Sequence, residues 1–404
     1  AMICEIFLQE YEKGLGKGEQ PIFPNIIFRV KEGVNREPED EYYYLYKLAC
    51  QVAAKRMNPT FMNIDADFNK EYYDKGYMPA TMGCRTYVMK NINGEPGCKG
   101  RGNIAPVTIN LPRIGIEAKG DIDKFFEILK SRLILAKESL LHRYGILKKL
   151  RVKDLPFVAG QKLMKGAENL EEEDSIEPIL KQGTWGIGFI GLAEALTALT
   201  GKHHGESKEA QKLGLKIIGH MRQRMDEACE KYKLNFSLIA TPAEGLSGRF
   251  TKIEEKIYGK LKGITDKEYY TNSFHVPVYY NISAYDKIKI EAPYHELTNG
   301  GHITYVELDG DTSNNLEAFE TIIRAMKELG IGYGSINHPV DRDPMCGYSG
   351  VIEGDICPKC GRNENDSNIK FDRIRRITGY LVGTVDRFND AKKAEVRDRV
   401  KHNK

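Results

Sequence analysis

Three cysteines near the C-terminus have the spacing of a metal site. Cys357 and Cys360 are separated by two residues and followed by a glycine, which is typical of a zinc knuckle. Structural zinc takes four ligands, and a matching pair ending at Cys346 would need a cysteine at position 343, where this chain has Asp343. We therefore predict a zinc site formed by Cys346, Cys357, Cys360 and Asp343, with His338 as the alternative fourth ligand. A redox-active cysteine pair is the competing interpretation.

A further cysteine, Cys84, stands alone between Gly83 and Arg85. A lone cysteine is more often a buried, small apolar side chain than a nucleophile. The sequence pairs no histidine with it, so the spacing does not indicate a thiol protease.

Glu244 lies in the segment Thr241–Gly245, which follows a strand-like run. This is where a loop would enter a helix, and the N–H groups at a helix start suit a phosphate. A purely structural helix cap is the alternative.

Two other motifs receive structural interpretations. The segment Gly186–Gly191 matches the GxGxxG pattern of dinucleotide-binding proteins, but the residues before it do not predict the strand that this fingerprint requires. We interpret its glycines as permitting close packing between a loop and a helix over Leu192–Leu199. The pair His203-His204 is expected at a solvated helix end.

The elements that must position these residues alternate between helices and strands. A helix is predicted over Asp121–Tyr144, a second one begins after the N-cap Ser207, and a third covers Asn315–Leu329. The strand-like runs are Asn25–Val30, Ile104–Leu111, Phe236–Ala240, Phe274–Tyr280, Ile303–Leu308 and Ile331–Ile336. This alternation favours a barrel or a sheet flanked by helices. After Gly330, glycine, proline, cysteine and charged residues dominate, which indicates a separate small module.

Composition narrows the function classes. The 404 residues are 41% hydrophobic and carry a formal net charge of +3 without a long basic run, which argues against nucleic-acid binding. No apolar stretch approaches the ~18–20 residues that a membrane helix needs. The eight scattered or clustered cysteines and the lack of an export signal favour a reduced, cytoplasmic setting. Met2–Tyr11 resembles the middle of a helix, so we expect an N-terminal region to be missing.

In combination, these motifs resemble class III, anaerobic ribonucleoside-triphosphate reductases, which are glycyl radical enzymes. The matching segments are Phe23–Phe28, Met82–Arg85, Arg101–Asn103, Thr108–Pro112, Gly188–Leu192, Thr241–Glu244, Leu297–His302, the cysteine-containing segment and Arg376–Leu381. The resemblance covers essentially the whole chain. It implies a ten-stranded α/β barrel with a central finger loop, followed by a C-terminal zinc-ribbon and glycyl radical module.

The resemblance also implies a domain division. We expect residues 1–330 to be the catalytic barrel portion, without the family's N-terminal barrel half and regulatory domain, and 331–404 to be the zinc and glycyl radical module. The family has four cysteines in that module, and this chain has three.

The resemblance assigns catalytic roles. Gly379, which pattern alone would interpret as a turn glycine, stores the radical, and Cys84 forms a transient thiyl radical. Asn103 bonds the ribose hydroxyls, and Glu244 accepts a proton near the ribose or orients the phosphate loop. The residues expected to contact substrate are Met82, Thr241, Ala243 and Glu244. We expect Gly379 to be buried and close to Cys84.

The implied activity is oxygen-sensitive reduction of ribonucleoside triphosphates to 2′-deoxyribonucleoside triphosphates. Formate is the reductant in most of the family, and a thiol pair in some. The implied cofactors are Zn²⁺ and the glycyl radical, and the implied partners are a radical S-adenosylmethionine activating enzyme and a second copy in a homodimer. The alternatives are a formate acetyltransferase-like glycyl radical enzyme, which typically has two adjacent cysteines that this chain lacks, and a non-enzymatic zinc-ribbon protein.

Overall fold

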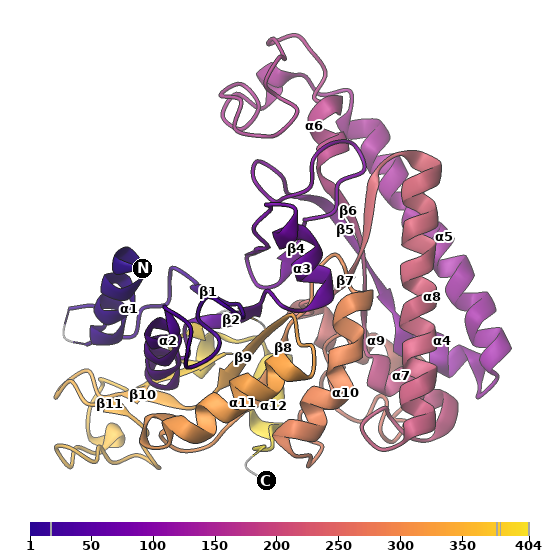
Figure 1. Ribbon diagram of the computed structural model, residues 1–404. Coiled ribbons are helices and arrows are strands. Elements are labelled where there is room, and N and C mark those ends of the chain that lie inside the picture. Colours follow the sequence, from indigo (N-terminus) through magenta and orange to yellow (C-terminus); the bar gives the residue numbers. More distant parts are fainter. Residues whose placement is uncertain (17, 377–378, 380, 403–404) are drawn as a thin grey trace. The chain divides into compact units, whose positions relative to one another are not determined.

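The computed structural model describes residues 1–16, 18–376, 379 and 381–402, and the chain divides into two compact units (Figure 1). The first unit comprises Ala1–Asp67, Val278–Ala292 and Ile303–Lys404, and the second comprises Phe68–Pro277 and Pro293–His302. Helix α10 (Ala284–Leu297) contributes residues to both units, and the division falls at Pro293. No helix in the described part of the chain is long and apolar enough to cross a membrane.

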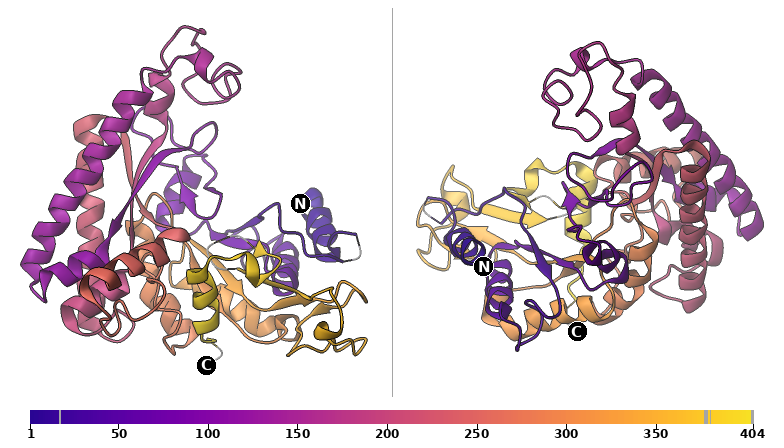
Figure 2. Two further views of the ribbon diagram at one scale, coloured as in Figure 1. Left: turned by 180° about the vertical axis from the view of Figure 1, so that it is seen from behind. Right: turned by 45° about the horizontal axis from the view of Figure 1, so that its top comes forward.

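The second unit is built on a parallel sheet, in the order β5-β6-β7. Its strands are β5 (Asn103–Asn110), β6 (Thr184–Ile190) and β7 (Asn235–Ala240). Its long helices, α5 (Ile122–Leu147) and α8 (Lys208–Tyr232), lie along one side of this sheet (Figures 1 and 2). The shorter elements are α3 (Asp67–Asp74), β3 (Thr81–Met82), β4 (Thr86–Tyr87), α4 (Leu111–Ala118), the 3₁₀ turn η1 (Val152–Asp154), α6 (Glu177–Gln182), α7 (Leu192–Thr200) and α9 (Gly245–Tyr258).

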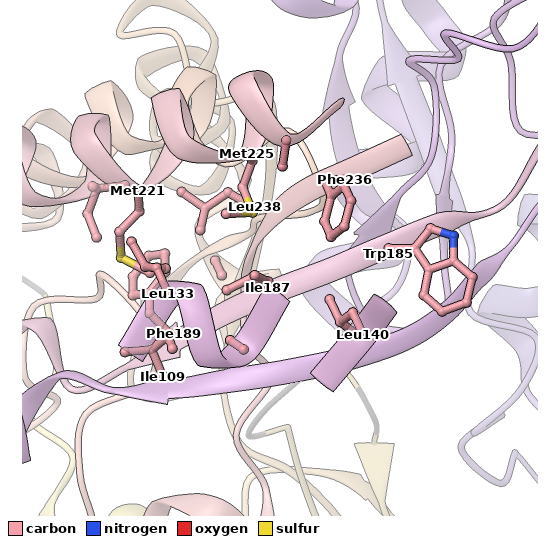
Figure 3. Close-up of a cluster of buried hydrophobic side chains, with 14 of the residues drawn as sticks. Ile109, Leu133, Leu140, Trp185, Ile187, Phe189, Met221, Met225, Phe236 and Leu238 are labelled. Carbon is pink, nitrogen blue, oxygen red and sulfur yellow. The ribbon is translucent and has the colours of Figure 1, made fainter. Parts of the chain in front are cut away.

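Local sequence explains the two long helices. The Asp121 side chain accepts a hydrogen bond from Lys124 N at 3.0 Å, and the Ser207 hydroxyl accepts one from Ala210 N at 3.3 Å, so both helices begin at a capping residue. The predicted apolar face of α5 is buried, and it consists of Phe125, Leu129, Leu133, Ala136 and Leu140. These side chains meet the apolar residues of β6 and α8 in the core of the unit (Figure 3).

Strand β6 has two different faces. Trp185, Ile187 and Phe189 are fully buried in the core shared with α5 and α8 (Figure 3). Because side chains alternate along a strand, Gly186 and Gly188 lie on the opposite face, whose middle therefore carries no side chain of β6. The interpretation of these glycines as a loop was wrong, since they lie inside a strand. The rejection of a dinucleotide fingerprint is supported, because that fingerprint places its glycines after the strand.

The first unit contains two four-stranded sheets. One has the order β1-β2-β9-β8, formed by β1 (Ile27–Val30), β2 (Thr60–Asn63), β9 (Tyr333–Asn337) and β8 (Thr304–Glu307). Its apolar core is shared with α1 (Met2–Lys13), α2 (Tyr43–Arg56), α10 and α11 (Leu316–Glu328). The connection before α11 contains the 3₁₀ turn η2 (Thr312–Asn314).

The other sheet has the order β11-β10-β12-β13 and is entirely antiparallel. Its strands are β10 (Val340–Arg342), β11 (Ser349–Gly350), β12 (Asp372–Arg376) and β13 (Leu381–Val382). The 3₁₀ turns η3 (Glu364–Asp366) and η4 (Val385–Arg387) and the helix α12 (Asp390–Asp398) complete this part of the chain. The segment 331–404 thus belongs to the first unit, and its separation at residue 330 stays a prediction.

One predicted strand requires correction. Phe274–Tyr280 is a loop with turns, although the residues Phe274–Val276 are buried. The mixed α/β class is confirmed, but the described strands form separate sheets of four, four, two and three strands, and a ten-stranded barrel is not observed among them.

The histidine pair was also placed wrongly. His203 and His204 are 6% and 2% exposed, so they do not lie on a solvated helix end. His204 Nε2 lies 2.8 Å from the carbonyl oxygen of Phe274, and His203 Nδ1 accepts a hydrogen bond from Gly205 N. Both rings therefore serve the packing of the second unit.

Candidate functional site

Cys84 lies at the tip of a short hairpin in the second unit. Strands β3 and β4 pair antiparallel, with Met82 opposite Thr86, so that Gly83, Cys84 and Arg85 form the turn. Gly83 has φ +55°, a conformation that glycine adopts readily. The Cys84 side chain is 6% exposed. A cysteine at a hairpin tip is held on both sides by paired backbone, which limits its movement.

The hairpin is fixed to the carboxyl end of β7. Gly301 forms bridges with both Thr86 of the hairpin and Ile239 of β7. A Cβ atom at Gly301 would lie 2.3 Å from the carbonyl oxygen of Arg85, so only glycine permits this close approach. The buried Arg85 guanidinium donates to Ala240 O at 3.5 Å. Cys84 is thereby brought to the end of β7, where the segment Thr241–Glu244 begins.

Arg101 holds the chain that follows the hairpin. Its guanidinium donates to five backbone carbonyls at 2.6–3.1 Å, and these belong to Val88, Met89, Lys90, Gly97 and Gln182. Burial lowers the pKa of Arg101 to about 10, which still leaves it charged at neutral pH. One side chain thus fixes the loop 88–97 against the start of β6.

Three helices begin at the carboxyl edge of the parallel sheet. β5 leads into α4, β6 into α7 through Gly191, and β7 into α9 through Thr241–Glu244. Glu244 is the N-terminal flanking residue of α9 and is exposed, as expected for a loop entering a helix. Helix N-termini carry partial positive charge, so this edge is suited to an anion.

Contacts from neighbouring segments hold Thr241–Glu244 in place. Ala243 N donates to Asn272 Oδ1 at 2.8 Å, and the Thr241 hydroxyl lies 3.2 Å from that of Thr108. The neighbouring Thr271 donates both its N–H and its hydroxyl to Glu194 Oε1. Burial raises the pKa of Glu194 to about 7, against the lowering effect of these bonds.

Asn103 lies elsewhere on the sheet. It pairs with Thr184 at the amino-terminal end of β6, and Thr184 Oγ1 donates to Asn103 Oδ1 at 3.4 Å. Its side chain lies beside Gly186, whose Cβ position is 3.4 Å from the Asn103 amide, and the Thr241 hydroxyl lies beside Gly188, two residues further along the same face of β6. The structure therefore brings Cys84 and Thr241–Glu244 to the carboxyl end of the sheet, and the Asn103 side chain lies on the same face of β6 as the Thr241 hydroxyl, one glycine earlier.

The predicted metal ligands lie together in the first unit. Ligand atoms of Asp343, Cys346, Cys357 and Cys360 all lie within 4.8 Å of one another. The two sulfurs of Cys346 and Cys357 are 3.5 Å apart, and Cys360 Sγ lies 3.4 Å from Asp343 Oδ2. Tetrahedral zinc with Zn–S of ~2.3 Å and Zn–O of ~2.0–2.2 Å requires ligand-to-ligand edges of roughly 3.5–3.8 Å. The donor set therefore fits zinc.

Asp343 occupies the position of a cysteine in a zinc knuckle. Gly347 N donates to Asp343 O and Gly361 N donates to Cys357 O, each at 2.9 Å, so the two turns have the same backbone pattern. The glycines have φ of +71° and +73°, as the predicted turn requires. His338 is excluded as the fourth ligand in this arrangement, because it lies outside the cluster and its Nε2 faces Ala53 O at 3.1 Å.

Arg362 orients the Asp343 carboxylate. Its Nη2 donates to Oδ1 at 2.7 Å, and Met345 N donates to the same oxygen at 2.9 Å, while Oδ2 faces Cys360. The hydrogen bonds from Arg362 hold the pKa of Asp343 well below its usual range. Metal-binding carboxylates are commonly supported in this way by a second residue.

Gly379 lies in the four-residue connection between β12 and β13. Arg376 pairs with Leu381 across that connection, whose other residues, Ile377, Thr378 and Tyr380, lie outside the described part of the chain. Gly379 is buried, as expected, and has φ +146°, which favours glycine. Its distance from Cys84, which belongs to the other unit, stays a prediction.

Sequence comparisons identify relatives along the whole chain. Residues 1–402 match the family described as "Anaerobic ribonucleoside-triphosphate reductase". The reductase of that name from Escherichia coli K12 is 37% identical over 414 residues, which cover 99% of this chain and 56% of the relative. The one from Enterobacteria phage T4 is 36% identical and is covered to 66%. The chain thus spans a little over half of the Escherichia coli relative.

Solved structures share the fold at low identity. An anaerobic ribonucleotide reductase superposes with a TM-score of 0.73 at 20% identity, covering 99% of this chain and 57% of that one. The Thermotoga maritima enzyme in complex with dATP and CTP has a TM-score of 0.66, at 20% identity and with 98% and 58% covered. A glycyl radical enzyme from Archaeoglobus fulgidus has a TM-score of 0.65 at 12% identity, with 98% and 54% covered.

Proposed function

The chain belongs to the anaerobic ribonucleoside-triphosphate reductase family, and we propose that it carries the stored radical, the thiyl cysteine and the zinc-binding module of such an enzyme. The proposed reaction is the oxygen-sensitive reduction of ribonucleoside triphosphates to 2′-deoxyribonucleoside triphosphates. The observation that carries this proposal is the family match over residues 1–402, and it is supported by the burial and positive φ of Gly379, the glycine to which the resemblance assigns the radical.

Gly379 suits radical storage for a physical reason. Without a Cβ atom, its Cα radical can become planar and conjugate with both flanking amides. The radical would abstract hydrogen from the Cys84 thiol, which restores the glycine and leaves a thiyl radical. Burial of Gly379 supports this role, because it separates the Cα–H bond from bulk water.

The Cys84 thiyl would then abstract hydrogen from C3′ of the ribose. A radical at C3′ makes loss of the 2′-hydroxyl as water feasible, and two electrons and two protons then complete the reduction. Formate, oxidised to carbon dioxide, or a thiol pair would supply the electrons. The final step returns hydrogen from Cys84 to C3′, which regenerates the thiyl radical.

The substrate is proposed to bind at the carboxyl edge of the β5–β7 sheet. Ligands of open parallel sheets bind at this edge. The triphosphate would lie at the N-terminus of α9, beside Thr241, Ala243 and Glu244, with Met82 near the ribose. Asn103 would contact the ribose from the glycine face of β6, where its amide lies beside Gly186 and the Thr241 hydroxyl lies beside Gly188.

We propose that Asp343, Cys346, Cys357 and Cys360 hold Zn²⁺, which when bound cross-links the two turns of the radical-bearing module. The further proposals carried over from the family are a partial ten-stranded barrel, a module boundary near residue 330, a homodimer, a radical S-adenosylmethionine activator and a cytoplasmic location. We propose no membrane or nucleic-acid partner.

Two alternatives make different predictions. A formate acetyltransferase-like enzyme typically has two adjacent cysteines, and none of the eight cysteines here are adjacent. A zinc-ribbon binding protein would bind nucleic acid and form no radical, which a DNA titration of the purified protein would detect.

Electron paramagnetic resonance after anaerobic activation tests the proposal. We expect a doublet from a glycine-centred radical, and oxygen exposure should then cleave the backbone at Gly379, leaving a short C-terminal peptide detectable by mass spectrometry. Gly379→Ala should show neither signal nor cleavage. A wild-type protein without the doublet, or a Gly379→Ala variant that retains it and forms deoxynucleotides, would contradict the proposal.

A further inference from the structure

Arg399 joins three separate segments of the first unit. It follows α12 directly and its side chain is 8% exposed. Nη1 donates to the carbonyl oxygen of Arg376 at 2.7 Å and to Glu307 Oε2 at 3.1 Å, and Nη2 lies 3.5 Å from Glu395 Oε1. One buried guanidinium therefore connects the end of β12, the end of β8 and the last helix.

Glu307 is a rigid anchor for this guanidinium. Its Oε1 accepts from Asn337 Nδ2 at 2.7 Å, so both carboxylate oxygens have partners on different strands or segments. Its backbone N–H donates to His402 Nδ1 at 2.9 Å, and its carbonyl accepts from His402 N at 2.8 Å. The C-terminal segment 399–402 is thereby fixed to β8 at two points.

Arg376 is fixed from its other side as well. Its buried side chain donates to Met57 O, to Asn58 Oδ1 at 2.9 Å and to the Ser335 hydroxyl. Its carbonyl group, which receives the Arg399 bond, is the last described backbone group before Gly379. The side chain of Arg376 thus fixes the end of β12 from one side, and the bond from Arg399 fixes its carbonyl group from the other.

We propose that Arg399 is a positioning residue for Gly379. It holds the carbonyl of Arg376 toward β8 and so sets the backbone course from which Gly379 follows three residues later. This inference rests on the proposed function, since it gives Arg399 a role in radical storage, but the geometry it claims exists before any radical is formed. The residue that positions the radical site then lies beyond it in the sequence, in the C-terminal segment.

Hydrogen–deuterium exchange of the unactivated protein tests the positioning directly. In Arg399→Gln, the rate of backbone amide exchange over residues 372–382 should rise by roughly tenfold or more. This is the change expected when a buried hydrogen bond from a charged donor is lost. Arg399→Lys should restore part of the protection. Arg397→Gln is the matched control, because Arg397 lies two residues earlier and its side chain is 66% exposed, and it should exchange as wild type.

A merely structural role would give a different pattern. If Arg399→Gln raised exchange equally over the first unit, including β1 and β2, or left residues 372–382 unchanged, the proposal would be overturned. If Arg399→Gln does not fold, Glu307→Gln is the second variant. It keeps the size of the Glu307 side chain but removes the charge that holds the Arg399 guanidinium. It should raise exchange at 372–382 to a smaller extent, and no change there would also overturn the proposal.

The radical provides the second measurement. In activated protein, the glycyl doublet should decay several-fold faster in Arg399→Gln than in wild type and Arg397→Gln, because a less constrained glycine is more accessible to quenching. Equal decay rates would overturn the positioning role. Absence of the doublet from wild type would instead refute the proposed function, while the exchange result would still decide the positioning of the segment.

Discussion

Gly188→Ala is predicted to destabilise the second unit by displacing Thr241. Gly188 lies on the bare face of β6, and a Cβ atom there would be 1.9 Å from Thr241 Oγ1 and 2.9 Å from Ile239 Cγ2. Favourable contacts between such atoms lie at ~3.5–4.0 Å, so the Thr241 side chain must turn away. It would then lose its 3.2 Å contact with the Thr108 hydroxyl.

The magnitude follows from three contributions. Forcing extra volume into a packed site costs ~1–3 kcal/mol, and losing one hydrogen bond costs about 1 kcal/mol. Replacing glycine by alanine inside a strand by itself stabilises the folded state by ~0.5–1 kcal/mol, because glycine loses more backbone entropy on folding. The net loss is therefore about 1–3 kcal/mol. Gly186→Ala is the matched control, because its Cβ would meet Asn103 at an ordinary 3.4 Å, and it should be neutral or slightly stabilising.

Urea unfolding followed by tryptophan fluorescence measures this difference. Trp185 is the only tryptophan of the chain, is fully buried and lies in β6 itself, so its signal reports on the second unit. The double variant Gly188→Ala/Thr241→Ala should recover at least ~1 kcal/mol relative to the sum of the single variants, since the clashing hydroxyl is gone. Equal stability of the variants at Gly188 and Gly186, or strict additivity with Thr241→Ala, would refute the reasoning.

Three further predictions concern His402, Asp343 and Cys84. Burial, followed by the charge of Lys287, lowers the pKa of His402 to about 4, below ~6.5 in the unfolded chain, so the unfolded state binds more protons between these values. Stability should therefore fall by up to about 3 kcal/mol as the pH drops through this window, and His402→Gln should flatten that slope in urea titrations. Asp343→Asn should weaken zinc binding by roughly tenfold or more in competition with a chelator, because a neutral amide is a poorer ligand, whereas Asp343→Cys should strengthen it; unchanged affinity in both would exclude Asp343 as a ligand. Cys84→Ser should abolish deoxynucleotide formation and keep the glycyl doublet, because an O–H bond is too strong to give hydrogen to the radical; turnover near the wild-type rate would assign the thiyl to another cysteine.

The long helices could be predicted because their determinants are local. The apolar spacing of α5 and the capping side chains of Asp121 and Ser207 lie within a few turns of the residues they organise. Phe274–Tyr280 failed for the opposite reason. Its apolar composition reflects burial, but its backbone partners include His204, far away in the sequence, rather than a neighbouring strand. Apolar runs indicate burial, and burial alone does not distinguish a strand from a buried loop.

The cluster of candidate metal ligands could be predicted from the sequence more fully than the other candidate residues. Two turns of fixed length bring ligands together whatever surrounds them, so Cys346, Cys357 and Cys360 could be identified from spacing. The choice between Asp343 and His338 needed the backbone, because both lie at plausible distances along the chain. The spacing to Cys346 already placed Asp343 in the position of a cysteine, and the repeated hydrogen-bond pattern of the two turns supports it over His338.

The arginines that fix the backbone of the candidate segments in each unit had no recognisable signal in the sequence, and the reason is general. Arg85, Arg101 and Arg399 all donate to backbone carbonyls of other segments, among them those of Ala240, Gln182 and Arg376. A carbonyl is present at every residue, so no residue type or spacing marks the one that a buried guanidinium will meet. Two residues that bind the same metal, by contrast, can both be recognised by their residue types. Sequence therefore reveals groups that act on a metal or substrate more readily than groups that fix the backbone carrying them. The effects of substitutions at Arg101 and Arg399 are accordingly the ones that a structure helps most to predict.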